Sequence, residues 1–298
     1  MPRSDQLIRS ALRASGAVSP ALGASLALRT FFATAPRMAV READAATDLD
    51  ARRRRVTVRG NEVVAYQWGD GTETALLLHG WRGRASQFSP LVRELVAAGL
   101  RVVSFDAPAH GASKGRRTDI RDWLEAVRLL DDGTGFDTII GHSFGGLAAL
   151  TAARHGVRAR AVAVVSGAAS PAAFLRVFGE GLGLDAATRA RFEERFRARM
   201  GVDAADLVAQ YDAVADPLPP GVELLVVHDR ADRQMPDTDA LRLHEAHGGR
   251  STLLRTEGLG HSRILADDRV LDALVSLTTG QVTAPENAAN AAPPVSST

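Results

Sequence analysis

Strand-length apolar segments alternate with helical patterns over most of the chain, and this alternation is the strongest constraint on its fold. After a first hairpin, predicted strands lie at 74–80, 101–107, 137–143, 160–168, 221–229 and 251–258. Predicted helices lie at 86–98, 119–130, 144–155, 237–247 and 262–278. Continuous apolar strands separated by helices are typical of a mostly parallel sheet that is buried on both faces. The sequence therefore predicts an α/β fold.

The alternating pattern defines a domain at 56–280 and two flanking segments. The domain begins with VTVRGNEVVAYQW, which predicts two short strands about a Gly-Asn turn. Residues 281–298 are rich in Ala, Pro, Asn and Ser, and this composition predicts a disordered tail. Residues 1–55 are expected to form a helical extension followed by a charged linker.

The N-terminal extension contains one moderately apolar stretch, at 19–38. Arg29 interrupts it, so we expect neither a secretory signal nor a membrane span. We expect a helix that packs on the domain instead. Its predicted apolar side consists of Leu22, Leu26, Phe31 and Phe32. A helix that binds a membrane surface or a partner protein is the alternative.

Residues 169–220 interrupt the alternation with sequence of helical character. Phe192, Phe196 and Met200 recur at every fourth position, which predicts the apolar face of a docked helix. A helical cap inserted at 169–220 would also cover whatever lies at the strand ends beneath it. Its solvated face is expected to carry the arginines at 189, 191, 195, 197 and 199.

Composition excludes several classes of function. The formal net charge is +1, so the chain has no overall attraction for nucleic acid or for a membrane surface. It contains no cysteine, which excludes disulfides, thiolate metal sites and cysteine nucleophiles. The lack of cysteine fits a reducing compartment, and we expect a cytoplasmic protein. The expected partner is a small molecule, and the sequence leaves the oligomeric state open.

The segment DTIIGHSFGGLAAL carries the strongest chemical motif. Gly141-His142-Ser143-Phe144-Gly145 matches G-x-S-x-G at the point where an apolar strand meets a helix. A serine on such a sharp turn adopts a strained backbone that projects its Oγ, and the glycines let strand and helix approach closely. A purely structural turn would not explain the serine. Ser143 is therefore the candidate nucleophile.

A serine nucleophile needs a base, and His261 is the candidate. It follows the strand 251–258 on a glycine-flanked loop, and in parallel sheets catalytic groups lie beyond the strand carboxyl ends. His110, on another loop at that edge, is the reserve candidate. Other histidines at strand ends are expected to hydrogen-bond the loop backbone: His79, His142 and His228.

The acid that orients the histidine is expected on the loop after the strand 221–229. HDRADRQMP offers Asp229, which is nearly part of the strand, and Asp232, which lies further out. With the chain order Ser, Asp, His as the guide, we favour Asp232, because its place further out on the loop lets it turn toward His261. Asp106 is the runner-up, and its competing interpretation is a carboxylate that stabilises a loop.

An oxyanion hole requires two backbone donors near the nucleophile. The Phe144 N–H, one residue after Ser143 and at a helix start, is the first candidate. The second is the N–H of Trp81 in LLLHGWRGR, where His79-Gly80 lets the chain turn.

Five motifs together resemble the alpha/beta-hydrolase superfamily: LLLHGWRGR, FDAPAHGAS, GHSFGG, HDRADRQMP and GLGHS. They occur in that family's order over about residues 56–280. The resemblance implies an eight-stranded sheet with a cap inserted after the sixth strand. It also implies a triad of Ser143, Asp232 and His261, with oxyanion donors at Trp81 and Phe144. Ala109 departs from the glycine that many members have there.

These residues predict a cofactor-independent serine hydrolase with no metal site. A carboxylesterase that cleaves an ester of a small or apolar acyl compound through an acyl-enzyme is the expected function. An acyltransferase or a thioesterase would keep the same triad, and so would a C–C bond hydrolase or a peptidase. A non-catalytic ligand-binding protein on this fold is the alternative from a different class.

Overall fold

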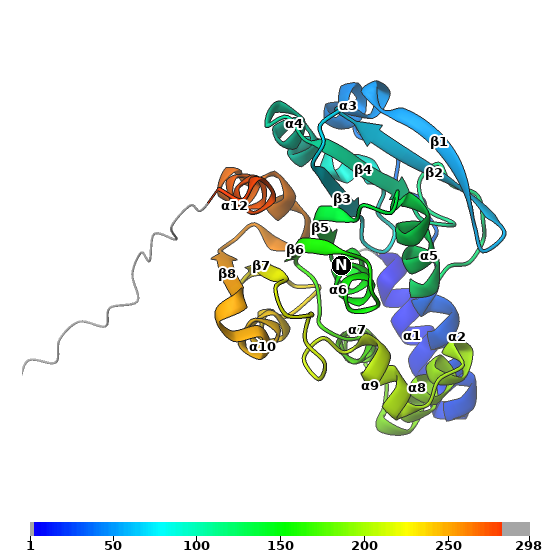
Figure 1. Cartoon of the computed structure of the whole chain (residues 1–298). Coiled ribbons are helices and arrows are strands. Elements are labelled where there is room, and N and C mark those ends of the chain that lie inside the picture. Colours follow the sequence, from blue (N-terminus) through cyan, green and yellow to red (C-terminus); the bar gives the residue numbers. More distant parts are fainter. Residues whose placement is uncertain (1–2, 282–298) are drawn as a thin grey trace, which may run out of the picture.

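The computed structural model describes residues 3–281. An eight-stranded sheet forms the centre of this part of the chain (Figure 1). Its strands are β1 (Arg52–Val58), β2 (Asn61–Trp68), β3 (Thr74–Leu78), β4 (Arg101–Asp106), β5 (Phe136–His142), β6 (Ala159–Val165), β7 (Glu223–Asp229) and β8 (Ser251–Thr256). They lie in the order β1-β2-β4-β3-β5-β6-β7-β8. β2 pairs antiparallel with β1 and β4, and every other pair is parallel. The predicted eight-stranded, mostly parallel sheet is confirmed.

Helices cover both faces of the sheet (Figure 1). They are α1 (Arg3–Val18), α2 (Pro20–Phe31), α3 (Ala45–Asp50), α4 (Ser89–Ala97), α5 (Ile120–Leu130), α6 (Phe144–Arg154), α7 (Pro171–Leu182), α8 (Ala186–Met200), α9 (Ala204–Tyr211), α10 (Asp237–His247), α11 (Gly260–Arg263) and α12 (Asp268–Thr279). Alternate strand residues point to opposite faces. Leu76 belongs to the apolar core that includes side chains of α5, α6 and α10, whereas Leu77 belongs to the core that includes side chains of α4 and α12.

Three helices, α7, α8 and α9, lie between β6 and β7, where the sequence predicts a cap after the sixth strand. Phe192, Phe196 and Met200 of α8 are all buried, as their spacing predicts. Arg191 and Arg195 are exposed, as expected for a solvated face. Arg189, Arg197 and Arg199 differ, because they are half-buried. The Arg199 guanidinium lies 4.0 Å from the centre of the Phe32 ring.

The N-terminal segment forms a hairpin of α1 and α2 that packs on α8 of the cap (Figure 1). Leu26, Phe31 and Phe32 pack against the main core, as expected. Leu22 does not, and the prediction for this residue is wrong: it is 55% exposed. The docked face of α2 instead carries small residues, because α2 crosses α1 and α8 too closely to admit large side chains there.

Strand β1 begins at Arg52, earlier than residue 56, where the alternating pattern begins in the sequence. Arg52–Arg55 are exposed on this edge strand, and Arg52, Arg53 and Arg55 have acidic or aromatic partners. Arg52 forms a bidentate pair with Asp70 at 2.5 and 2.6 Å, and Arg53 lies 5.4 Å from the centre of the Tyr66 ring. The four consecutive arginines therefore belong to a strand of the sheet and not to the expected linker.

The predictions of a disordered tail and of no secretory signal at the N-terminus stay predictions. The expected disordered tail lies outside the described residues, except for Gln281. Within residues 3–281, no helix combines the length and the apolar character that crossing a membrane requires.

Gly23 permits the close crossing of α2 with its neighbours. A Cβ at this position would lie 2.9 Å from the Gly16 Cα and 2.9 Å from the Thr188 Cγ2, closer than packed atoms allow. We expect Gly23→Val to lower the thermal unfolding midpoint, since overpacking costs about 1–3 kcal/mol. Ala21→Val, at an exposed position of the same helix, is the matched control. Equal midpoints for the two variants would contradict the close crossing.

Candidate active site

Ser143 occupies a strained turn between β5 and α6. Its backbone has φ 54° and ψ −118°, a conformation that non-glycine residues rarely adopt. Gly145 lets helix α6 approach the sheet, because a Cβ there would lie only 2.0 Å from the Leu78 carbonyl oxygen. The expected combination of a strained serine and a flanking glycine at a close approach is thus present.

His261 and Asp232 are joined by a hydrogen bond. His261, which lies in the single turn of α11, places Nδ1 2.8 Å from Asp232 Oδ2. Asp232 Oδ1 accepts from the backbone N–H groups of Gln234 at 2.7 Å and Met235 at 3.1 Å. Burial by itself would raise the pKa of Asp232, but these hydrogen bonds outweigh it and hold the pKa below its ordinary value. An ionised Asp232 keeps a proton on His261 Nδ1, which leaves Nε2 available as a base.

Ser143 and His261 line the same cavity, of about 530 Å³. The cavity is bounded near the serine by Gly80, Trp81 and Phe144. The structure therefore brings together three residues that are far apart in the sequence, since Asp232 is bonded to His261. A hydroxyl, an imidazole and a carboxylate are the three groups that serine hydrolases use for proton transfer to and from a nucleophile.

The alternative acids are bound elsewhere. Asp106 is completely buried and accepts hydrogen bonds from Tyr66 Oη at 2.8 Å, Ala85 N at 2.8 Å and Ala112 N at 2.7 Å. These bonds connect β2 and the loops after β3 and β4. Asp106 thus has the partners of a carboxylate that stabilises loops.

Asp229 has a similar structural environment at the end of β7. Its carboxylate accepts from Thr256 Oγ1 at 2.7 Å, from Leu259 N at 2.9 Å and from Ala231 N at 3.0 Å. It therefore connects the loop that carries Asp232 to the segment that leads to His261. His110, the reserve base, is buried against Trp81 and Trp123, with its Nδ1 3.0 Å from the Pro108 carbonyl.

The two candidate oxyanion donors belong to residues that line the cavity together with Ser143. Phe144 is the first residue of α6, where backbone N–H groups have no partner within the helix and the helix dipole favours negative charge. The backbone of Gly80, which precedes Trp81, lies close to Ser143: a Cβ on Gly80 would lie 2.9 Å from Ser143 Cβ. The Trp81 side chain is held by stacking on Trp123, with ring centres 5.8 Å apart.

His142, immediately before Ser143, forms a hydrogen bond to the segment that carries His261. Its Nδ1 lies 2.9 Å from Gln87 Nε2, and its Nε2 lies 2.8 Å from the His261 carbonyl oxygen. Burial is the main cause that lowers the pKa of His142 to about 3, so the ring is neutral. Because the Gln87 amide donates to Nδ1, the ring proton is on Nε2 and is donated to His261. His79 and His228 also hydrogen-bond loop carbonyls, as the sequence predicts for all three.

Part of the cavity is built by residues that sequence reasoning did not connect with the site. Thr30, Phe31, Ala33 and Met38, from the end of α2 and the segment after it, line the cavity with Ser143. Their apolar character was visible in the sequence, but no pattern placed them beside the strand ends. Among residues 3–281, no group of three His, Cys, Asp or Glu side chains is arranged so that it could hold a metal ion.

Residues 75–273 match a model of the alpha/beta hydrolase family, and the match covers more than half of the chain. The chain belongs to the alpha/beta hydrolase family. This membership agrees with the order of the strands and with the turn at Ser143. No curated protein matches the chain significantly in sequence.

Solved structures share the fold of this alpha/beta hydrolase at low sequence identity. An esterase from Pyrococcus furiosus has 16% identity and a TM-score of 0.61, over 82% of this chain and 98% of the other. The mouse alpha/beta hydrolase domain-containing protein 10 has 16% identity and a TM-score of 0.59, over 77% and 98%. A meta-cleavage product hydrolase from Pseudomonas fluorescens has 18% identity and a TM-score of 0.57, over 78% and 99%. These likenesses establish the fold alone.

We expect His142 to position His261, and substitution tests this. His142→Leu removes the donor to the His261 carbonyl, so the reaction of Ser143 with a fluorophosphonate should slow by about ten- to a hundredfold, as small misplacements of reacting groups do. His142→Gln retains an N–H donor and is expected to restore most of the rate. The labelling rates are measured from reactions quenched at successive times. Equal labelling rates for both variants and the unmodified chain would show that His142 has no positioning role.

Proposed function

We propose that this chain is a serine hydrolase, and specifically a carboxylesterase that acts on an ester of a small or apolar acyl compound. The observation that carries the proposal is the bond between His261 Nδ1 and the buried Asp232 carboxylate, 2.8 Å long, in a cavity that His261 shares with the strained Ser143. An oriented imidazole that faces the same cavity as a serine hydroxyl is the arrangement that activates a serine for attack on a carbonyl carbon.

The reaction proceeds in two halves. Ser143 Oγ attacks the ester carbonyl carbon while His261 Nε2 removes the hydroxyl proton, and Asp232 stabilises the imidazolium that forms. The oxyanion accepts hydrogen bonds from the backbone N–H groups of Trp81 and Phe144. Collapse of this intermediate breaks the bond to the alkoxy oxygen, which leaves with the proton from His261.

The acyl-enzyme is then cleaved by water. His261 removes a proton from the water molecule as its oxygen attacks the acyl carbon, and the same two N–H groups hold the second oxyanion. Breaking the bond to Ser143 Oγ returns the proton to the serine and releases a carboxylic acid. The apolar side chains of α7 that line the cavity favour an apolar acyl group over a charged one: Phe174, Val177, Phe178 and Leu182.

Ser143→Ala tests the nucleophile. We expect it to abolish labelling by a fluorophosphonate and to lower the turnover of p-nitrophenyl esters by about 10⁴-fold or more, because the acyl-enzyme cannot form. Ser262→Ala is the matched control, since Ser262 lines the same cavity and should retain both reactions. Absence of labelling in the unmodified, folded chain would instead favour a non-catalytic binding protein.

Asp232→Asn and Asp106→Asn separate the catalytic acid from the structural one. Asp232→Asn should lower turnover by about 10³- to 10⁴-fold, because the histidine loses its oriented tautomer. Asp106→Asn should lower the free energy of unfolding by about 3 kcal/mol, since buried donors lose their carboxylate, and change turnover per folded molecule little. Urea unfolding and steady-state kinetics measure the two effects, and an exchange of these outcomes would transfer the acid role to Asp106.

A further inference from the structure

The segment Thr30–Met38, called the strap below, forms one wall of the cavity over Ser143. Thr30, Phe31, Ala33 and Met38 line the cavity, and residues of cap helix α7 line it as well. The strap lies outside residues 75–273, the part of the chain that matches the family model. The cavity is therefore lined both by residues of the matched part and by a wall that lies before it in the sequence.

The strap is bound to the loop after β3, which carries the proposed oxyanion donor Trp81. The Ala33 carbonyl accepts from Trp81 Nε1 at 2.9 Å and from Arg82 Nε at 3.1 Å. Further along, the Met38 carbonyl accepts from Arg84 Nη1 at 3.3 Å. These bonds join the strap to the domain on either side of Arg37, so the wall has a defined position relative to Ser143.

Arg37 adds a second attachment. Its guanidinium donates to the Ser113 carbonyl at 2.6 Å and to the Gly115 carbonyl at 2.9 Å, in the loop after β4. The strap is thus held against two loops at the edge of the sheet where the site lies. A wall that is already positioned does not have to be ordered when a substrate binds, which favours selective binding.

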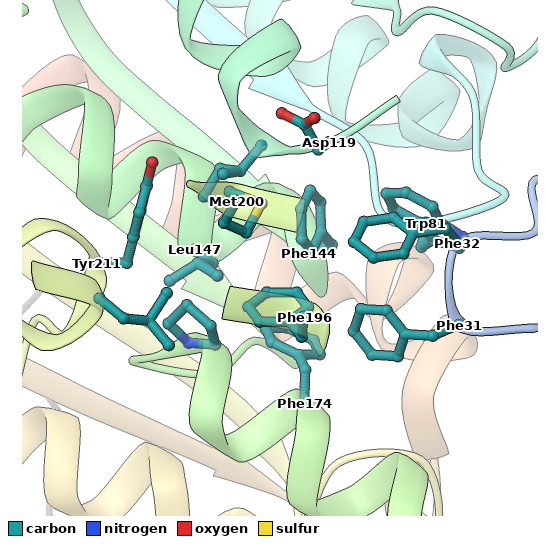
Figure 2. A pocket seen from close by; sticks show the side chains of 13 residues that line it. Phe31, Phe32, Trp81, Asp119, Phe144, Leu147, Phe174, Phe196, Met200 and Tyr211 are labelled. Atoms are coloured by element: carbon teal, nitrogen blue, oxygen red, sulfur yellow. The ribbon is translucent and has the colours of Figure 1, made fainter. Parts of the chain in front are cut away.

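Phe31 connects the strap to the cap. Its ring meets the rings of Phe178, Phe192 and Phe196 edge to face, with centres 5.0, 5.6 and 5.8 Å apart. Figure 2 shows Phe32 beside Trp81, and the Phe31 and Phe32 rings both contact that of Phe196. Aromatic rings packed in this way present a continuous apolar surface.

A second, smaller cavity of about 30 Å³ continues this apolar surface (Figure 2). Phe31, Trp81, Phe144 and Phe174 line both cavities. These four aromatic side chains are therefore shared walls of the two cavities, and Phe196, Met200 and Leu207 of the cap also line the smaller one.

We propose that the strap is the substrate-selecting wall of the site, and that it binds an apolar acyl chain of medium length between Phe31 and α7. This inference rests on the proposed function, in which Ser143 carries the acyl group. Chain length is selected because each added methylene of the substrate is removed from water against the strap and the cap. A polar or very short acyl group gains nothing from this wall.

Kinetics with p-nitrophenyl octanoate and acetate test the wall. Phe31→Ala should lower the ratio of kcat/KM for octanoate to that for acetate by about tenfold, since lost apolar contacts in a pocket have effects of this size. Ala33→Leu, which adds volume to the same wall and leaves the aromatic rings intact, should also lower the ratio. Leu22→Ala, at an exposed position of α2, is the control and should keep it. Unchanged ratios in both strap variants would overturn the proposal.

A binding measurement without catalysis tests the proposed role of the strap separately from the proposed reaction of Ser143. In a Ser143→Ala background, isothermal titration calorimetry with octanoate should show weaker binding for Phe31→Ala and Ala33→Leu than for Leu22→Ala. Equal octanoate binding in all three would refute the wall whatever Ser143 does. Octanoate binding that depends on Phe31, in a chain whose Ser143 is not labelled by fluorophosphonate, would support the wall and refute the serine hydrolase.

Discussion

Parallel pairing of the strands from β4 to β8 is the constraint on which the rest of the structure depends. Parallel strands end at the same edge of a sheet, so the loops that follow them meet there. Ser143 follows β5, Asp232 follows β7 and His261 lies after β8. The register of the sheet therefore assembles the site, and helices on both faces bury the strands that hold it in place.

Three aspartates near that edge have different roles because they have different hydrogen-bond partners. Asp106 and Asp229 accept bonds from backbone and hydroxyl groups and connect loops to each other. Asp232 accepts from His261 as well as from its own loop. A buried carboxylate must find donors wherever it lies. Which donors it finds decides whether it supports the fold or orients the imidazole.

Much of the fold and of the candidate site could be predicted because both depend on local patterns. Buried strands have continuous apolar runs, and the turn at Ser143 needs its glycines, so both are visible in short segments. Asp232 is preferred over Asp229 from its position further out on the loop after the strand, and its bond to His261 agrees with that preference. Leu22 was wrongly placed in the core, because the faces of a helix can be read from sequence only when its partners are known. The strap was missed because its contacts with Trp81 and Arg82 span almost fifty residues.

The sequence by itself determined the alternating fold, the strained serine between strand and helix, and the candidate acid and base. These features follow from residue spacing and from backbone sterics within a few residues. Only the tertiary structure decided that the N-terminal hairpin docks on the cap, that the strap completes the cavity, and that His142 supports the His261 backbone. Such contacts join distant segments, and their energies depend on shape complementarity in three dimensions, which no local pattern contains.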